Sequence, residues 1–209
     1  MDLDHVFVFV EPGGGAAAAK LDAAGLVANF SRKHVGQGTE NRCYVFDNAY
    51  LELLWVTDPE VLGSATFYRT QLFQRSRWKS NGASPFGVGV RNATPLPFPC
   101  WLWQTPYLPP GLLLEVAKVS AEPRNPFLFR FPGAQRPDHW HDGRGGERQR
   151  AAGLAEIAEL RLDALPDGEA TEHVVIDPGL RPHHAELHLS RVDGGPPRRL
   201  ALPAFDWLA

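Results

Sequence analysis

The sequence predicts an α+β fold in which strands outnumber helices. Short runs of β-branched and aromatic residues, such as residues 5–10 and 50–56, recur along the chain and are typical of strands. The 209 residues include 20 glycines and 19 prolines, a composition that favours turns and short elements over long helices. Helical composition or spacing is clearest in residues 16–25 and 58–78.

Residues 1–57 follow one order of elements: a strand, a helix and three further strands. The helix, residues 16–25, is rich in alanine, and Gly25 stands where a C-terminal glycine cap is expected. The glycines of Gly36-Gln37-Gly38-Thr39 predict a bend between the second and third strands. The four strands are expected at residues 5–10, 31–36, 42–46 and 50–56.

Residues 58–131 predict a helix followed by four strands. Asp58 and Pro59 suit the start of a helix, and apolar residues then recur at spacings of three and four up to Trp78. Glycine alternates with larger residues in residues 86–90, which predicts a strand that another group can approach closely. The four strands are expected at residues 86–90, 100–105, 112–119 and 127–131.

The rest of the chain predicts a polar loop and a strand-rich end. Residues 132–152 are rich in glycine and arginine, which is typical of a loop. Residues 153–164 fit neither the helical nor the strand period cleanly, and their position among strands favours a strand. Residues 184–192 and 199–205 flank the turn Asp193-Gly194-Gly195 and predict a hairpin.

Charge and composition exclude several classes of function. Lysine and arginine total 21 against 24 acidic residues, a net charge of -3, and no basic run predicts nucleic-acid binding. No apolar run approaches the roughly 20 residues of a membrane span, and the acidic start is unlike a secretory signal, so a cytoplasmic protein is expected. Cys43 and Cys100 lack CxxC spacing and are expected as free, buried thiols. Hydrolase and nucleotide-binding glycine motifs do not occur.

Four separated segments share a pattern with a known family. They are Leu3-Asp4-His5-Val6, Gly36-Gln37-Gly38-Thr39-x-Asn41, Ala49-Tyr50-Leu51-Glu52-Leu53 and Pro126-Phe127-Leu128-Phe129. Together with the order of elements in residues 1–57, they resemble the glyoxalase-like domain family of the vicinal oxygen chelate superfamily. The resemblance is fullest over residues 1–57, extends in part over residues 83–132 and fades over residues 150–209.

The resemblance implies paired βαβββ modules that form a cupped mixed sheet, with a degenerate second module and a C-terminal β extension. Such a chain divides into five parts. They are expected as a first module at residues 1–57, a linking helix at 58–82, a second module at 83–132, a polar loop at 133–152 and a strand-rich extension at 153–209.

The resemblance also implies a divalent metal ion in the cup, held by the first and fourth strands of each module. His5 matches the first-strand ligand and Glu52 the fourth-strand ligand, and these donors suit zinc, nickel, iron or manganese. Period-two alternation allows both side chains to face one cavity. In the second module, Ser84 or Pro85 and Arg130 stand at the expected ligand positions, and a guanidinium does not ligate metals.

His5 and Glu52 also have simpler interpretations. His5 could be a hydrogen-bonded histidine at the start of a strand. Glu52 lies in an apolar strand, where an unpaired carboxylate is costly, so it needs a metal, a cation or an exposed cavity. A salt bridge to Arg130 is one alternative. If that pair faces the cup, Arg130 would instead bind a carboxylate of the substrate.

Further candidate residues lie in other strands. Glu115 is a second carboxylate in an apolar strand and a candidate catalytic base, with a structural role as the alternative. Thr39 and Asn41 are candidate ligand contacts that could instead stabilise the bend. Trp103 is a candidate substrate-binding residue that could equally be part of the core or the cavity wall.

The loop at residues 133–152 contains the densest cluster of donor groups. His139 and His141 are spaced by two, so they could project together from an extended segment and move protons. The abundance of arginine and glycine around them favours a solvated lid without metal.

The sequence therefore predicts one of two functions. The first is a metal-dependent lyase, isomerase or dioxygenase that acts on a small molecule with vicinal oxygens, with His5 and Glu52 holding the ion. The second is a metal-free protein that binds or sequesters a small molecule in the same cup, with aromatic walls and Arg130 as an anion anchor. The resemblance also admits a homodimer in which a second chain completes the site.

Overall fold

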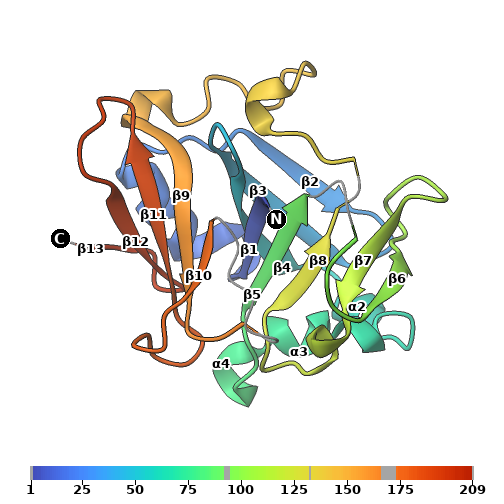
Figure 1. Ribbon diagram of the computed structural model, residues 1–209. Coiled ribbons are helices and arrows are strands. Elements are labelled where there is room, and N and C mark those ends of the chain that lie inside the picture. The colour runs from blue at the N-terminus through green and yellow to red at the C-terminus, as the bar shows by residue number, and fades with distance from the viewer. Residues whose placement is uncertain (1, 92–94, 132, 166–172, 209) are drawn as a thin grey trace.

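The computed structural model describes residues 2–91, 95–131, 133–165 and 173–208, which form two mixed sheets (Figure 1). The remaining residues, which include parts of the second module and of the extension expected above, lie outside the described residues. The first sheet has 8 strands and the second has 5, with few helices, so the α+β fold is confirmed.

The first half of the larger sheet has the βαβββ order that the sequence predicts. It consists of β1 (Asp2–Phe9), α1 (Gly15–Ala23), β2 (Phe30–His34), β3 (Thr39–Val45) and β4 (Tyr50–Val56). The glycine expected to end the helix, Gly25, has a positive φ of 84°. Both cysteines are free, with Cys43 buried and Cys100 partly exposed.

The second half of the larger sheet repeats the strand pairing of the first. Its strands are β5 (Phe86–Arg91), β6 (Cys100–Gln104), β7 (Leu113–Ala117) and β8 (Phe127–Arg130). The strand order is β2-β3-β4-β1-β5-β8-β7-β6, so β1 and β5 meet at the centre. β1 is parallel to β4 as β5 is parallel to β8, and the two central strands are antiparallel.

The smaller sheet comes from the C-terminal part of the chain. Its strands are β9 (Leu154–Leu162), β10 (Val174–Ile176), β11 (Ala185–Arg191), β12 (Arg198–Leu202) and β13 (Asp206–Leu208), in the order β10-β9-β11-β12-β13. The strand expected near residues 153–164 and the hairpin of β11 and β12 are both confirmed. The two short edge strands, β10 and β13, were not predicted.

The two sheets share one apolar core. Buried residues of the smaller sheet, among them Ile157 and Leu187, belong to the same cluster as Val88 and Leu128 on the outer face of the larger sheet. The described residues between β5 and β6 contain no helix, so the smaller sheet supplies apolar cover on this side of the molecule. The Asn48 side chain donates to the Ile157 carbonyl at 2.9 Å and accepts from its N–H at 2.9 Å, which fixes β9 against the turn before β4.

The connection between the two halves is irregular rather than one helix. The prediction of a helix over residues 58–78 is wrong, because Gln71 has a φ of 54° and interrupts the helical path. The predicted start is confirmed, since Asp58 accepts hydrogen bonds from the N–H groups of Glu60 and Val61. The helices are α2 (Pro59–Leu62), α3 (Leu72–Ser76) and α4 (Trp78–Asn81).

Single 3₁₀ turns complete the structure. They are η1 (Pro12–Gly14), η2 (Tyr68–Thr70), η3 (Lys118–Ala121), η4 (Pro137–His139) and η5 (Arg150–Ala152). Among the described residues, every helix is too short or too polar to cross a membrane.

Candidate functional site

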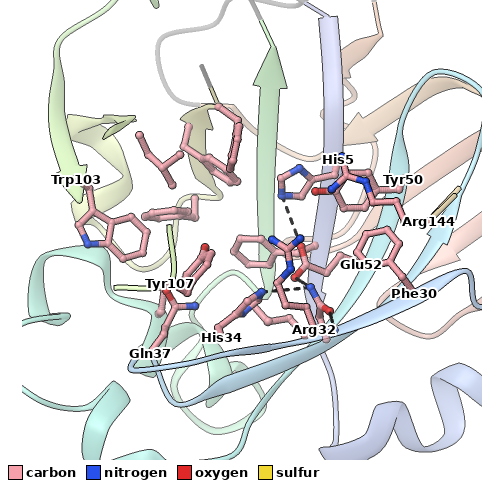
Figure 2. Close-up of a pocket in the computed structure, with 18 residues that line it drawn as sticks. His5, Phe30, Arg32, His34, Gln37, Tyr50, Glu52, Trp103, Tyr107 and Arg144 are labelled. Carbon is pink, nitrogen blue, oxygen red and sulfur yellow. Dashed lines mark hydrogen bonds and ion pairs between the residues drawn. The ribbon is translucent and has the colours of Figure 1, made fainter. Parts of the chain in front are cut away.

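A cavity lies on the concave face of the larger sheet, between its two halves (Figure 2). Its volume, including the open mouth, is about 680 Å³. The apolar part of the lining comprises Phe7, Leu54, Leu72, Trp103, Leu114, Phe127, Phe129 and Phe131. The polar part comprises His5, Arg32, His34, Gln37, Asn41, Glu52 and Arg144, with Phe30, Tyr50 and Tyr107 beside it.

Strand alternation brings His5 and Glu52 into this cavity, as the sequence predicts. Side chains at every second position of a strand share a face, and β1 pairs with β4 so that Phe7 lies opposite Glu52. The Nε2 atom of His5 is 3.6 Å from an Oε atom of Glu52. Both residues are 5% exposed, so this contact is almost fully desolvated. The predicted convergence of the two groups is therefore observed.

Glycines on β5 make room for the two rings that β1 presents. A Cβ atom at Gly87 would lie 2.0 Å from the Phe7 ring, and one at Gly89 would lie 2.7 Å from the His5 ring. Any larger residue would therefore displace these rings. The close approach that the alternating glycines predicted is confirmed.

An irregularity in β1 gives His5 a second carboxylate partner. Pairing between β1 and β5 shifts register between Leu3 and His5, so that Asp4 has no partner residue on β5. The Asp4 carboxylate accepts a hydrogen bond from His5 Nδ1 at 2.7 Å. It also lies 3.8 Å from the guanidinium of Arg91. His5 is thus held between two carboxylates.

A series of hydrogen bonds links Glu52 through Asn41 of β3 to the bend between β2 and β3, residues 36–39. Asn41 Nδ2 donates to Glu52 at 2.7 Å and lies 3.3 Å from His34 Nε2. His34 Nδ1 is 2.8 Å from the Thr39 hydroxyl, which also accepts from the Gln37 amide at 2.9 Å. Asn41 lines the cavity. Thr39 is fully buried and does not line the cavity, but its hydroxyl orients the His34 ring.

The two histidines of the cavity have opposite pKa shifts. Burial lowers the pKa of His5, but the hydrogen bond to Asp4 and the charges of Asp4 and Glu52 outweigh this, and the net pKa lies above 6.5. Burial dominates at His34 and holds its pKa below 6.5. A neutral His34 with its proton on Nδ1 satisfies both of its contacts, because Nε2 can then accept from Asn41.

We expect a histidine titration followed by NMR to separate the two rings, with His5 titrating above pH 6.5 and His34 below it. The contribution of His5 to stability is complete below its unfolded pKa and is lost as the pH rises through its folded pKa. Asp4→Asn should lower the pKa of His5, because it removes the hydrogen-bonded charge. Asp2→Asn, an exposed change on the same strand, is the control. A wild-type His5 that titrates below pH 6.5 would contradict this assignment.

Glu115 and Arg130 do not face the cavity, which corrects their predicted roles there. Because β8 alternates, Phe127 and Phe129 line the cavity, and Arg130 points to the other face. There the Arg130 guanidinium donates to Glu115 from Nε at 2.9 Å and lowers the pKa of that carboxyl. Glu52 is paired with His5 and Asn41, so the alternative salt bridge from Glu52 to Arg130 is also wrong.

The donor set does not fit a metal centre. Gly87 and Gly89 hold the cavity-facing positions of β5, and Phe127 and Phe129 hold those of β8, so the second half offers no ligand. Over residues 2–91, 95–131, 133–165 and 173–208, no three His, Cys, Asp or Glu side chains are grouped as a metal site. Protein metal centres generally take three or four protein ligands.

The loop between β8 and β9 lies at the mouth of the cavity and contributes Arg144 to its lining. The guanidinium of Arg144 lies 3.7 Å from the centre of the Trp140 ring and 6.0 Å from that of Phe30. His139 and His141 are exposed and do not line the cavity, which agrees with the favoured interpretation of a solvated loop and not with the alternative in which they move protons there. A smaller hollow under this loop shares Arg32, Tyr50, Phe131 and Arg144 with the main cavity.

Sequence reasoning missed Arg32, His34 and Arg144. The alternation of Phe30, Arg32 and His34 along β2 was a usable signal, because every second residue of that strand faces the cavity. No local pattern marks Arg144, which reaches the mouth only through the folded path of the loop. Of the predicted ligand contacts, Asn41 and Trp103 line the cavity.

Comparison with known proteins finds a match to a family model. The model of a family described as a glyoxalase-like domain matches residues 3–95, which include all of β1 to β5 except Asp2. No curated protein and no solved structure matches the chain.

Proposed function

Because the model of a glyoxalase-like domain matches residues 3–95, we propose that the cavity inside the cupped sheet, the cup, binds a small organic molecule without a metal ion. The observation that carries this proposal is the lining of the second half, where glycines of β5 and phenylalanines of β8 hold the cavity-facing positions and offer no metal ligand. A cavity with apolar walls and a few convergent polar groups is the usual form of a small-molecule site.

Different residues of the cup would contact the apolar and the polar part of the ligand. Aromatic rings of Phe7, Phe127 and Phe129 pack against each other at centroid distances of 5.4 to 6.5 Å and offer a wall for an apolar group. His5 and Glu52 present a donor and an acceptor to the polar part of the ligand. Their contacts with Asp4 and Asn41 hold both side chains in place before a ligand enters.

The second candidate is the metal-dependent lyase, isomerase or dioxygenase that the family resemblance implies. One observation favours it: the hydrogen bond from His5 Nδ1 to Asp4 is the arrangement that orients metal-ligating histidines in many proteins. The homodimer that could complete such a site stays a prediction.

Metal analysis distinguishes the two candidates. We expect the purified protein, incubated with zinc, nickel, iron or manganese and then desalted, to hold far less than one ion per chain. Its metal content should be the same in His5→Ala and Glu52→Gln. One ion per chain, lost in both variants, would support the enzyme instead.

A neutral probe tests the cup itself. We expect 3-phenylpropanol to bind in calorimetric titrations, and Leu114→Trp to weaken this binding by at least about tenfold because the larger ring fills the cavity. Leu102→Trp, on the neighbouring strand at a site 63% exposed, is the matched control and should leave binding unchanged. Equal binding to both variants would place the probe elsewhere and contradict the proposal.

A further inference from the structure

Two arginines from distant parts of the chain meet at the mouth of the cup. Arg32 comes from β2, where alternation with Phe30 and His34 turns it toward the cavity. Arg144 comes from the loop after β8. Both line the main cavity (Figure 2). Both also line the smaller hollow, which shares residues with it.

The positive charge of these arginines is only partly neutralised. Within the described residues the Arg32 side chain makes no ion pair or hydrogen bond, although its backbone N–H donates to Asn41. The Arg144 Nε atom lies 3.2 Å from one exposed carboxylate, that of Asp142, and its guanidinium stacks on Trp140. An anion at the mouth could therefore take up contacts that the protein leaves open.

Glu52 of the main cavity and Asp4 of the smaller hollow are bonded to groups other than these two arginines. Glu52 contacts His5 and accepts from Asn41. Asp4 accepts from His5 and faces Arg91. A ligand group near Arg32 and Arg144 therefore meets two guanidinium groups whose one ion pair within the described residues is with the exposed Asp142, while other walls of the cavity are aromatic.

We propose that the ligand is an aromatic or branched apolar monocarboxylate; this proposal rests on the proposed function above. Its carboxylate lies between Arg32 and Arg144, because a planar guanidinium matches a carboxylate with two parallel hydrogen bonds. Its apolar part packs on Phe129 and the neighbouring rings of the second half. A second negative charge is disfavoured, because Glu52 faces the same cavity.

The test compares an acid with its matched alcohol, 3-phenylpropionate with 3-phenylpropanol, in titration calorimetry of the full chain. We expect the acid to bind at least about tenfold more tightly, and Arg32→Gln and Arg144→Gln each to weaken its binding by about tenfold to hundredfold. Both variants should change binding of the alcohol by less than about twofold. Arg42→Gln, on the outward face of β3 and paired with Asp22, is the control and should affect neither ligand.

The outcomes separate the two proposals. If acid and alcohol bind equally, or if the arginine variants leave acid binding unchanged, the carboxylate assignment is overturned and the binding cup stands. If neither compound binds, the proposed function fails as well. Tight acid binding that both arginine variants weaken and Arg42→Gln preserves supports the assignment.

Discussion

Leu187→Asp is expected to unfold the whole chain rather than the C-terminal sheet alone. Leu187 is 0% exposed and pairs with Leu160 on β9 and Leu200 on β12, inside the core that both sheets share. The change removes a buried leucine and inserts a carboxylate with no partner, a loss of about 5 kcal/mol or more. Typical domains have a total stability of about 5 to 15 kcal/mol, so little folded protein should remain.

The measurement is urea denaturation followed by near-ultraviolet circular dichroism, which reports the packing of the tryptophans. Val192→Asp, at the exposed end of the same hairpin, is the control and should change stability by less than about 0.5 kcal/mol. A Leu187→Asp protein that keeps most of the near-ultraviolet tryptophan signal would show that the larger sheet folds without the smaller one, because only Trp207 of the six tryptophans lies in the smaller sheet.

Arg75→Met is the second large effect, with an expected loss of about 3 to 5 kcal/mol. Arg75 in α3 is 0% exposed and donates to the carbonyls of Thr70, Ser120 and Asn125 at 2.8 to 2.9 Å, and to that of Glu122 at 3.2 Å. Burial lowers its pKa to about 9, so the guanidinium stays charged at neutral pH. Methionine fills much of the space but leaves these carbonyls without their donor.

Two further variants test whether the loss of stability depends on the guanidinium group and on its buried position. Arg75→Lys keeps the charge but cannot reach several carbonyls at once, so it should also be destabilising. Arg77→Met, two residues along on the exposed side, should have little effect. If Arg75→Met unfolds at the same urea concentration as the wild type, the guanidinium does not hold the turn between β7 and β8 in place.

The family resemblance selected His5 and Glu52, and period-two alternation allowed both side chains to face one cavity. This alternation placed His5 on one face of β1 and Glu52 on one face of β4, and the structure brings these groups within 3.6 Å of each other. The same rule applied to β8 would have turned Arg130 away from the cup and Phe129 toward it. That error came from matching a family position and not from the local pattern.

Other parts of the site depend on tertiary contacts that no short segment encodes. Adjacent residues of a regular strand point to opposite faces, so the contact between Asp4 and His5 depends on the register shift in β1. Arg144 reaches the mouth through a loop whose path depends on the stacking of its guanidinium on Trp140. The shared core of the two sheets likewise involves residues about a hundred positions apart, such as Val88 and Leu187.

The two halves of the sheet line the cavity with different residues, and this difference affects the orientation in which a ligand binds. The strands β4 and β8 hold corresponding places in the sheet, yet one presents Glu52 and the other presents Phe127 and Phe129. In the orientation proposed above, the carboxylate of the ligand lies toward Arg32 and Arg144. A ligand turned end for end would press that carboxylate against the phenyl rings of β8, at a cost of several kcal/mol. We therefore expect the cavity to bind its ligand in one orientation, even though the two halves of the sheet have corresponding strand orders.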